Sequence, residues 1–399
     1  MRRIRTVLLA SLVGAPLALG AVATAATAAE IPGAYIVTLK SGDPAAAADD
    51  ARTRHGATVS HVYRYAMRGY AGHMSPRAAA AVARQDGVAS VVADQTVTAA
   101  AQTLPTGINR IDGELSSTRS GDGTGAVNVD VAVIDTGIDL THPDLNVVGG
   151  KNCSNGRSYA DGNGHGSHVA GTIGAKDDGI GVVGVAPGAR LWAVRVLNNQ
   201  GSGSWSSIIC GLDYVTGNAG TIEVANMSLG GTGTDTGCND GGMHQAICRS
   251  VAAGVTYAVA AGNEADDAKN HVPAAYDEVM TVSALADFDG NPGGLGAPTC
   301  RADVDDTFAD FSNFGADVDL IAPGVCIYST WKGGGYNTIS GTSMATPHVT
   351  GGAALYKSTH PTASPAQVKS ALQAAGTTNW NNADDRDRVK EPLLNVSAF

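Results

Sequence analysis

Aromatic residues, charged residues and long apolar runs are all scarce in this 399-residue sequence. Phe, Trp and Tyr together make up 5% of the chain, and charged residues make up 16%. Few aromatic residues beside 52 glycines favour a closely packed protein with many tight turns. After residue 29 no apolar stretch is long enough to cross a bilayer, so we expect no membrane partner for this part of the chain.

The sequence also lacks an excess of basic residues. It has 26 Lys and Arg against 37 Asp and Glu, for a net charge of −11. Residues 1–29 and 30–101 each carry a small positive charge, so the acidic excess lies in residues 102–399. An acidic domain argues against nucleic acid and anionic membranes as partners. It fits a soluble extracellular protein, which we expect to be a monomer.

The first 29 residues have the pattern of a secretory signal peptide. A basic end with three arginines precedes an apolar stretch at 7–22, and small residues with A-x-A-like sites fill 23–29. A membrane anchor is the alternative, but the apolar stretch is short and is interrupted by Gly14 and Pro16. We therefore predict a cleaved signal peptide and a secreted product.

Residues 30–101 predict a small α+β domain. Strand and helix patterns follow one another in the order βαββαβ, which is the ferredoxin-like arrangement. The expected strands are 34–40, 58–64, 70–74 and 87–92, and the expected helices are 44–55 and 76–86. An ordinary N-terminal interaction domain is one interpretation of this segment, and a second one depends on the motifs farther along the chain.

Residues 102–399 alternate between apolar strand patterns and helix patterns. This alternation predicts an α/β domain with a parallel, doubly wound sheet. The expected strands are 129–134, 191–196, 222–226, 255–260, 279–282 and 318–321, and the expected helices are 165–176, 204–218, 242–253, 342–359 and 365–375. The Gly- and Asp-rich segment 288–310 is expected to be a loop insertion.

Three short motifs place Asp, His and Ser at the ends of these elements. Asp135 directly follows a strand, His165 opens a helix after a Gly-rich loop, and Ser343 stands at a helix N-terminus with Pro347 expected near the first turn. Because ligands of parallel sheets bind beyond the strand carboxyl ends, the three side chains can meet at one edge. They match the needs of acyl transfer, with Ser343 as nucleophile, His165 as base and Asp135 orienting the base.

Other interpretations of these residues are possible. Ser343 could serve only as a helix cap, and Asp139 is a rival for Asp135. His165 and His168 could bind a metal, but no third ligand follows at the spacing of zinc proteases. No cysteine lies in the three motifs, which disfavours a thiol nucleophile.

The three motifs together resemble those of the subtilisin-like serine proteases (subtilases), nearer the secreted, proteinase K-like branch. The resemblance covers residues 105–375 strongly and 34–98 weakly. It implies a secreted serine endopeptidase of broad specificity that works through an acyl-enzyme. Residues 30–101 then resemble the family's inhibitory propeptide, and we expect the precursor to cut itself between Thr98 and Thr103.

The resemblance also implies an oxyanion donor and a substrate cleft. Asn263 lies in an Ala-Ala-Gly-Asn motif after an apolar strand, where its amide could donate to a developing oxyanion. Two Gly-rich segments would pair with an extended polypeptide substrate on both sides, and a third would help to line the pocket for the residue before the cleaved bond. These cleft residues are Gly201, Ser202, Gly203, Ser228, Leu229, Gly230, Ala260, Ala261 and Gly262.

A structural calcium site is expected by the same resemblance. The segment 176–182 has the length and shape of a subtilisin calcium loop, and oxygen ligands from such a loop suit Ca²⁺. The ligands carried over are the side chains of Asp144 and Asp178 and the carbonyls of Lys176, Ile180 and Val182. A solvated acidic turn is the alternative. Val169 stands where proteinase K has a cysteine, so the metal and disulfide layout of that enzyme is not transferred.

Six cysteines in a secreted chain predict disulfides, although the sequence leaves their connectivity open. Spacing favours Cys238 with Cys248 and Cys300 with Cys326, which leaves Cys153 for Cys210. Free buried thiols are the alternative.

Two further functions compete with the endopeptidase. An esterase is disfavoured because Ser343 lacks the Gly-x-Ser-x-Gly motif and the chain order is Asp–His–Ser. A non-catalytic relative could have lost a catalytic residue, but Asp135, His165, Asn263 and Ser343 are all present.

Overall fold

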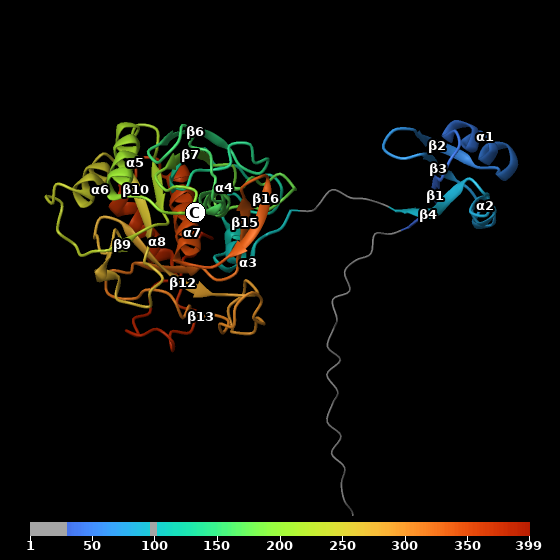
Figure 1. The fold of residues 1–399 in the computed structure, drawn as a ribbon. Helices are drawn as coiled ribbons and strands as arrows, with labels where there is room; N and C mark the ends of the chain where they lie inside the picture. Colours follow the sequence, from blue (N-terminus) through green and yellow to red (C-terminus); the bar gives the residue numbers. More distant parts are fainter. Residues whose placement is uncertain (1–29, 96–101) are drawn as a thin grey trace, which may run out of the picture. The chain divides into compact units, whose positions relative to one another are not determined.

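The computed structural model describes residues 30–95 and 102–399, which belong to two compact units divided between Ala99 and Ala100 (Figure 1). The expected signal peptide at 1–29 and most of the expected processing segment lie outside the described residues. Within the described residues, no helix is both long and apolar enough to cross a membrane.

The first unit is a four-stranded antiparallel sheet with two helices, in the predicted βαββαβ order. The sheet order is β2-β3-β1-β4. Asp43 and Ser75 cap the two Ala-rich helices with their side chains, and Gly56 ends the first one in the left-handed region at φ 64°. Its elements are β1 (Glu30–Leu39), α1 (Pro44–His55), β2 (Thr58–Tyr63), β3 (Gly69–His73), α2 (Pro76–Val82) and β4 (Val88–Gln95).

The second unit is organised on an eight-stranded sheet with the order β13-β12-β10-β8-β5-β7-β6, in which β14 also pairs with β12. All pairings are parallel except the one between β12 and β13. The strands are β5 (Asp130–Asp135), β6 (Val147–Asn152), β7 (Arg190–Arg195), β8 (Val224–Met227), β10 (Thr256–Ala260), β12 (Met280–Ala286), β13 (Thr307–Phe308) and β14 (Leu320–Pro323).

Helices cover both faces of this sheet, as predicted. In β5, Val131 and Val133 pack in one apolar cluster, whereas Ala132 and Ile134 pack in another, because successive side chains of a strand point to opposite faces. The first cluster contains the apolar side chains of α4 (His165–Gly174), α7 (Thr342–Thr359) and α8 (Pro365–Ala375), and the second those of α5 (Trp205–Gly217) and α6 (Met243–Ala252). Figure 1 shows α5 and α6 side by side. The fold class predicted from the sequence is thereby confirmed.

Several elements were not predicted. They include the edge strand β6, the short helix α3 (Thr106–Arg110) and the hairpin of β15 (Ile327–Trp331) and β16 (Gly335–Ile339). Short polar or Gly-rich segments carry no clear periodicity, so pairing with a neighbour decides their structure. The remaining short elements are η1 (Gly113–Leu115), β9 (Gly231–Thr232), η2 (Ala268–Asn270) and β11 (His271–Val272).

All six cysteines form disulfides, in the pairs that spacing favours. Cys153, directly after β6, is bonded to Cys210 in α5, so the disulfide joins the sheet edge to a covering helix. Cys238 is bonded to Cys248 in α6, and Cys300 to Cys326. The last bond ties the predicted loop insertion, which contains only the short strand β13, to the segment before β15.

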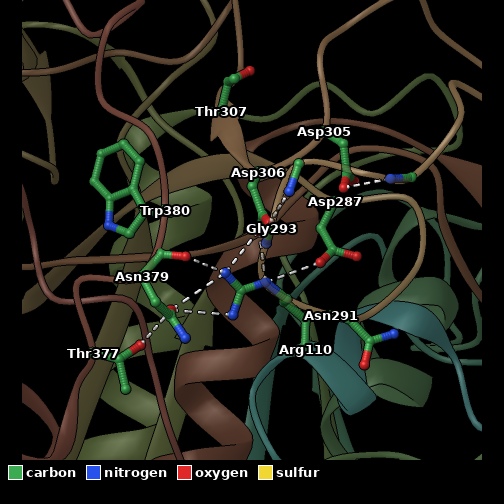
Figure 2. A network of polar contacts seen from close by, with 12 residues as sticks. Arg110, Asp287, Asn291, Gly293, Asp305, Asp306, Thr307, Thr377, Asn379 and Trp380 are labelled. Carbon is green, nitrogen blue, oxygen red and sulfur yellow. Dashed lines mark hydrogen bonds and ion pairs between the residues drawn. The ribbon is translucent and has the colours of Figure 1, made fainter.

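A buried arginine holds this insertion at two further points, Asp306 and the adjoining Asp287 (Figure 2). Arg110, at the end of α3, donates from Nε and Nη2 to Asp306 Oδ1 at 2.8 and 2.7 Å. Its Nε also lies 3.0 Å from Asp287 Oδ2, and Nη2 donates to the Asn379 carbonyl oxygen at 3.0 Å. One cation is therefore shared by two buried carboxylates and links the insertion to the C-terminal segment.

Replacing Arg110 with methionine is expected to lower the free energy of unfolding by about 3–5 kcal/mol, because two carboxylates would lose their buried counter-ion. Urea unfolding of the second unit in a Ser343→Ala background measures the change without self-digestion. Lys269→Gln is the control, since the Lys269 side chain is two-thirds exposed where it pairs with Asp267 and should contribute less than about 1 kcal/mol. Equal stability of the two variants would show that the Arg110 pairs are dispensable.

Candidate active site

Asp135 is the last residue of β5 and has no exposed surface. Its strand lies between β7 and β8, so a continuous apolar run brings the carboxylate to the carboxyl edge of the sheet. The Oδ1 atom accepts a hydrogen bond from the Thr136 N–H at 2.6 Å. His165 Nδ1 lies 2.8 Å from Oδ1 and 3.0 Å from Oδ2 of Asp135, which joins the first two predicted residues.

His165 is held at the start of α4 by a second carboxylate, that of Asp161. Asp161 Oδ1 accepts the N–H groups of Asn163 and Gly164 at 2.8 and 2.9 Å, and Oδ2 accepts the Ser167 hydroxyl at 2.6 Å. The Thr136 hydroxyl donates to Asp161 Oδ1 and accepts the Gly166 N–H, each at 2.9 Å. Thr136 and Asp161 therefore lock the His165 loop onto the end of β5.

Glycines flank His165 because the loop runs against other parts of the chain. A Cβ at Gly166 would lie 2.1 Å from the Gly137 carbonyl oxygen, which excludes any side chain there. Gly164 has φ 116°, and a Cβ on it would lie 2.3 Å from the Trp331 ring. Each close approach brings the imidazole within reach of Asp135.

Ser343 is the second residue of α7, and its hydroxyl donates to the Ser228 carbonyl oxygen at 3.3 Å. Pro347 does not lie in the first turn, as the sequence suggested, but five residues after the helix start at Thr342. A proline has no N–H for the carbonyl four residues before it, which here is that of Ser343. The Ser228 hydroxyl donates to this carbonyl instead, at 2.8 Å.

Asn263 lies beside Ser343, and Thr342 fixes its orientation. Asn263 Oδ1 accepts the Thr342 N–H at 2.8 Å and the Thr342 hydroxyl at 3.1 Å. Because the amide oxygen is engaged in this way, the Nδ2 group is left as the donor of the side chain. The Thr342 hydroxyl also accepts the Gly262 N–H at 3.2 Å, which joins the Asn263 loop to the helix that carries the serine.

Among the described residues no hydrogen bond joins the Ser343 hydroxyl to His165 Nε2. Such bonds are often long in unliganded hydrolases and tighten when substrate binds. His168 is fully buried and its Nε2 lies 2.9 Å from the Ile327 carbonyl oxygen, so it does not form a metal pair with His165. Burial lowers the pKa of His168 to about 3, which keeps this imidazole neutral.

Two hollows adjoin these residues and share Leu229 and Gly230. The larger, of about 800 Å³, is lined by His165, by Gly201 to Gly203 and by Ser228. The smaller, of about 200 Å³, is lined by Ser343, Asn263, Ala260 and Gly262. Ala261 lines neither hollow. It is fully buried and packs with Ala268, Ala274 and Val318, because alternate residues of a strand end point inward.

Each of the two units matches the model of a known protein family. Residues 127–389 match the model of the subtilase family, and residues 34–100 match that of peptidase inhibitor I9. The chain belongs to the subtilase family. Its second unit is a serine endopeptidase domain, and an inhibitor-type propeptide domain precedes this unit in the sequence.

Individual relatives agree with this assignment. Subtilisin DY of Bacillus licheniformis is 40% identical over 302 residues, which cover 75% of this chain and 99% of that protein. Subtilisin NAT of Bacillus subtilis subsp. natto is 38% identical over 351 residues, with 86% and 85% of the two chains covered. The crystal structure of a cold-adapted subtilisin-like serine proteinase has 34% identity and a TM-score of 0.60, and covers 73% of this chain and 98% of its own.

The charges around His165 control its protonation. Burial alone would lower the pKa of His165, but the charge of Asp135, its hydrogen bond and then the charge of Asp161 raise the pKa above the ordinary value. The base works only when neutral, so activity should fall as pH drops through this raised pKa.

Replacing Asp161 with asparagine is expected to move the acidic limb of the kcat/KM profile to lower pH, because a charge that raises the pKa of His165 is removed. Peptide hydrolysis followed across pH measures the shift. Asp139→Asn is the control, since the Asp139 carboxylate accepts from Thr141 and from the Gly333 and Gly334 N–H groups, and only the Asp139 backbone N–H bonds to Ser167. An acidic limb at the same pH in Asp161→Asn and in the unchanged enzyme would contradict the role of Asp161.

Proposed function

We propose that the subtilase hydrolyses peptide bonds through Ser343, His165 and Asp135. His165 takes the Ser343 hydroxyl proton as the serine attacks the carbonyl carbon, and returns it to the leaving amine. Asp135 keeps the Nδ1 proton facing itself, so that Nε2 is the basic nitrogen, and stabilises the imidazolium. The observation that carries the proposal is the 2.8 Å contact of His165 Nδ1 with the fully buried Asp135 carboxylate.

The negative charge of the tetrahedral intermediate is assigned to Asn263 and the Ser343 backbone. The Nδ2 group of Asn263 is left free to donate by the two bonds that Thr342 makes to its oxygen. The N–H of Ser343 stands in the first turn of α7, where helix N–H groups have no partner within the helix. In subtilisin itself, removing one such donor costs about 10²–10³-fold in turnover, and a loss of that order is expected here.

The proposed substrate is an extended segment of an extracellular protein. Gly201 to Gly203 and Ser228 to Gly230 line the larger hollow, where backbone groups could pair with a substrate strand from both sides. Leu229, Gly230, Ala260 and Gly262 line the smaller hollow beside Ser343. Small walls of this kind favour broad specificity.

We further propose that the chain is made as a secreted, inactive precursor and acts as a monomer. Residues 1–29 would be the signal peptide, 30–101 the inhibitory propeptide and 102–399 the catalytic domain. The first described residues after the proposed cut are bound to the catalytic domain, since the Gln102 and Thr103 N–H groups donate to the Gly179 and Gly181 carbonyl oxygens. Cleavage before Gln102 would leave these contacts intact.

The calcium site expected from the resemblance has donor atoms that fit Ca²⁺. Asp144 is fully buried and its Oδ1 atom has no hydrogen-bond partner, while Oδ2 accepts the Val182 N–H at 2.9 Å. Burial is the main cause that raises the pKa of Asp144, and a cation beside the carboxylate would oppose this effect. Asp178, Lys176, Ile180 and Val182 belong to the adjoining loop, whose carbonyl and carboxylate oxygens are ligands that Ca²⁺ prefers.

Gln102 is a ligand candidate that the sequence interpretation missed. Its Nε2 group donates to the carbonyl oxygens of Lys176 and Val182 at 2.7 and 3.2 Å, and its Oε1 atom is buried without a partner. The side-chain amide thus occupies the centre of the proposed ligand set. A bound cation would favour the opposite amide orientation, with Oε1 facing the loop.

Replacing Ser343 with alanine is expected to abolish casein hydrolysis and labelling by an organophosphonate, and to leave residues 30–101 attached to the secreted protein. Intact mass and N-terminal sequencing measure the processing, and casein digestion measures activity. Ser206→Ala, at an exposed position in α5, is the matched control and should behave like the unchanged protein. Normal processing of Ser343→Ala would show that another protease matures the chain.

Chelation is expected to lower the melting temperature, because calcium binds the folded state in preference to the unfolded chain. At a calcium concentration 100 times Kd, one site stabilises by about 2.7 kcal/mol. Asp178→Asn should remove part of the difference between melts in calcium and in EDTA. Asp213→Asn, on the exposed side of α5, is the control. Equal calcium responses in both variants would refute the site at Asp178.

A further inference from the structure

A second acidic cluster lies in the C-terminal segment, far along the chain from the calcium loop. Asp385, Asp387 and Glu391 each offer a carboxylate oxygen, and these oxygens lie within 4.8 Å of one another. Oxygens on opposite sides of one Ca²⁺ ion are about 4.6–5.2 Å apart, since each bond measures about 2.3–2.6 Å. The spacing of the cluster therefore suits a single ion of this size.

The two inner carboxylates are buried and unsatisfied. Asp385 and Glu391 are each 2% exposed, and none of their four oxygens has a partner at hydrogen-bond distance and angle, although the Arg386 and Asp387 N–H groups lie near the Asp385 carboxylate. Burying a polar group without a partner is costly, and burying a charged group costs more. Together with the spacing of one oxygen from each of the three residues, these buried oxygens point to a ligand that accepts electron pairs.

No protein cation fills this position. Among residues 30–95 and 102–399, no ion pair includes Asp385, Asp387 or Glu391. Arg386 and Lys390 have other partners, and the exposed Arg388 makes no ion pair with the cluster. Arg386 donates to the Ala265 carbonyl oxygen at 2.6 Å, and Lys390 Nζ lies 5.6 Å above the Trp380 ring.

The Arg110 network is a direct comparison within the same domain. There, a guanidinium lies between the carboxylates of Asp287 and Asp306 and pairs with both (Figure 2). Asn381, which follows Trp380, donates its N–H to the Asp306 carbonyl oxygen at 2.7 Å, so the two acidic groups belong to one continuous structure. Asp287 and Asp306 thus pair with an arginine, whereas Asp385 and Glu391 pair with no basic side chain of the described residues.

The loop that carries the cluster is closed by its own contacts. The Trp380 Nε1 group donates to the Glu391 carbonyl oxygen at 3.1 Å, and the Asn382 amide donates to the Arg388 carbonyl oxygen at 3.1 Å. These bonds bring the two ends of the loop together, with Asp385 and Glu391 inside it. A ligand set that is already formed needs little rearrangement to bind an ion.

We propose that Asp385, Asp387 and Glu391 form a binding site for a hard divalent cation of the Ca²⁺ class, separate from the loop at 176–182. The ion closes the C-terminal loop and supplies the charge that Arg110 supplies beside it. Its competitor is the proton: burial, and then the charge of Asp387, raise the pKa of Asp385 to about 7, and burial raises that of Glu391 to about 8.

Terbium titration of the metal-free, full-length Ser343→Ala protein tests the site. Tb³⁺ replaces Ca²⁺ at oxygen sites and emits when a nearby tryptophan transfers energy to it. Trp380 contacts Glu391, so bound Tb³⁺ should emit upon tryptophan excitation, and added Ca²⁺ should quench the signal. Trp380→Phe should remove this part of the emission, which assigns the signal to an ion bound beside Trp380.

Isosteric variants identify the ligands. Glu391→Gln and Asp385→Asn should weaken Tb³⁺ binding at this site by roughly 10–100-fold or more, because each removes a charged ligand. Asp384→Asn is the matched control, since Asp384 is the exposed neighbouring residue. Asp178→Asn should leave the Trp380-dependent signal unchanged, so failure of this site and failure of the proposed calcium loop can be told apart.

Asp387→Asn keeps the test decisive if the buried variants do not fold, because Asp387 is half-buried and still offers an oxygen to the Val389 N–H. In EDTA, removal of one of the three carboxylates should raise the melting temperature through reduced repulsion, while in calcium it should lower it. Binding stoichiometry and Tb³⁺ affinity that match those of Asp384→Asn in all three variants would overturn the proposal.

Discussion

The contact between His165 and the buried carboxylate of Asp135 is the interaction on which the rest of the site depends. A carboxylate with no exposed surface is costly unless it is paired and hydrogen-bonded. Here the imidazole and the Thr136 N–H supply those partners. The same pairing holds the ring in one orientation and raises its pKa, so stability of the strand end and reactivity of the base have one cause.

The Thr136 and Thr342 hydroxyl groups connect the segments that carry the reactive residues. Thr136 links the end of β5 to Asp161 and to the start of α4, and Thr342 links the Asn263 loop to the start of α7. Ser228 completes the connection, because it donates to the Ser343 carbonyl that Pro347 leaves without a helical partner. The three segments that carry the chemistry are thus joined by short side chains next to the reactive residues.

Much of the fold could be predicted because its signals are local and strong. Buried parallel strands such as β5 and β10 are continuous apolar runs, and the Ala-rich helices of the first unit have their caps in the sequence. By contrast, β6 and the β15–β16 hairpin contain glycines and polar residues, and pairing with neighbours decides their structure. The bounds of α7 were predicted correctly, but Pro347 was expected near its first turn although it lies five residues after the start, where the Ser228 hydroxyl replaces the missing N–H.

The amino-acid sequence by itself determined the reactive residue types and their order, the secretory pattern and the alternation of strands and helices. The tertiary structure alone decided the contacts between distant residues. It directed Ala261 into the core, aligned the Asn263 amide through Thr342 and brought Gln102 to the proposed calcium loop. It also left Asp385 and Glu391 buried without a counter-ion, while Arg110 paired with Asp287 and Asp306. The reason is physical: periodicity and motifs report the backbone, whereas the partner of a buried polar atom depends on which remote segment packs against it.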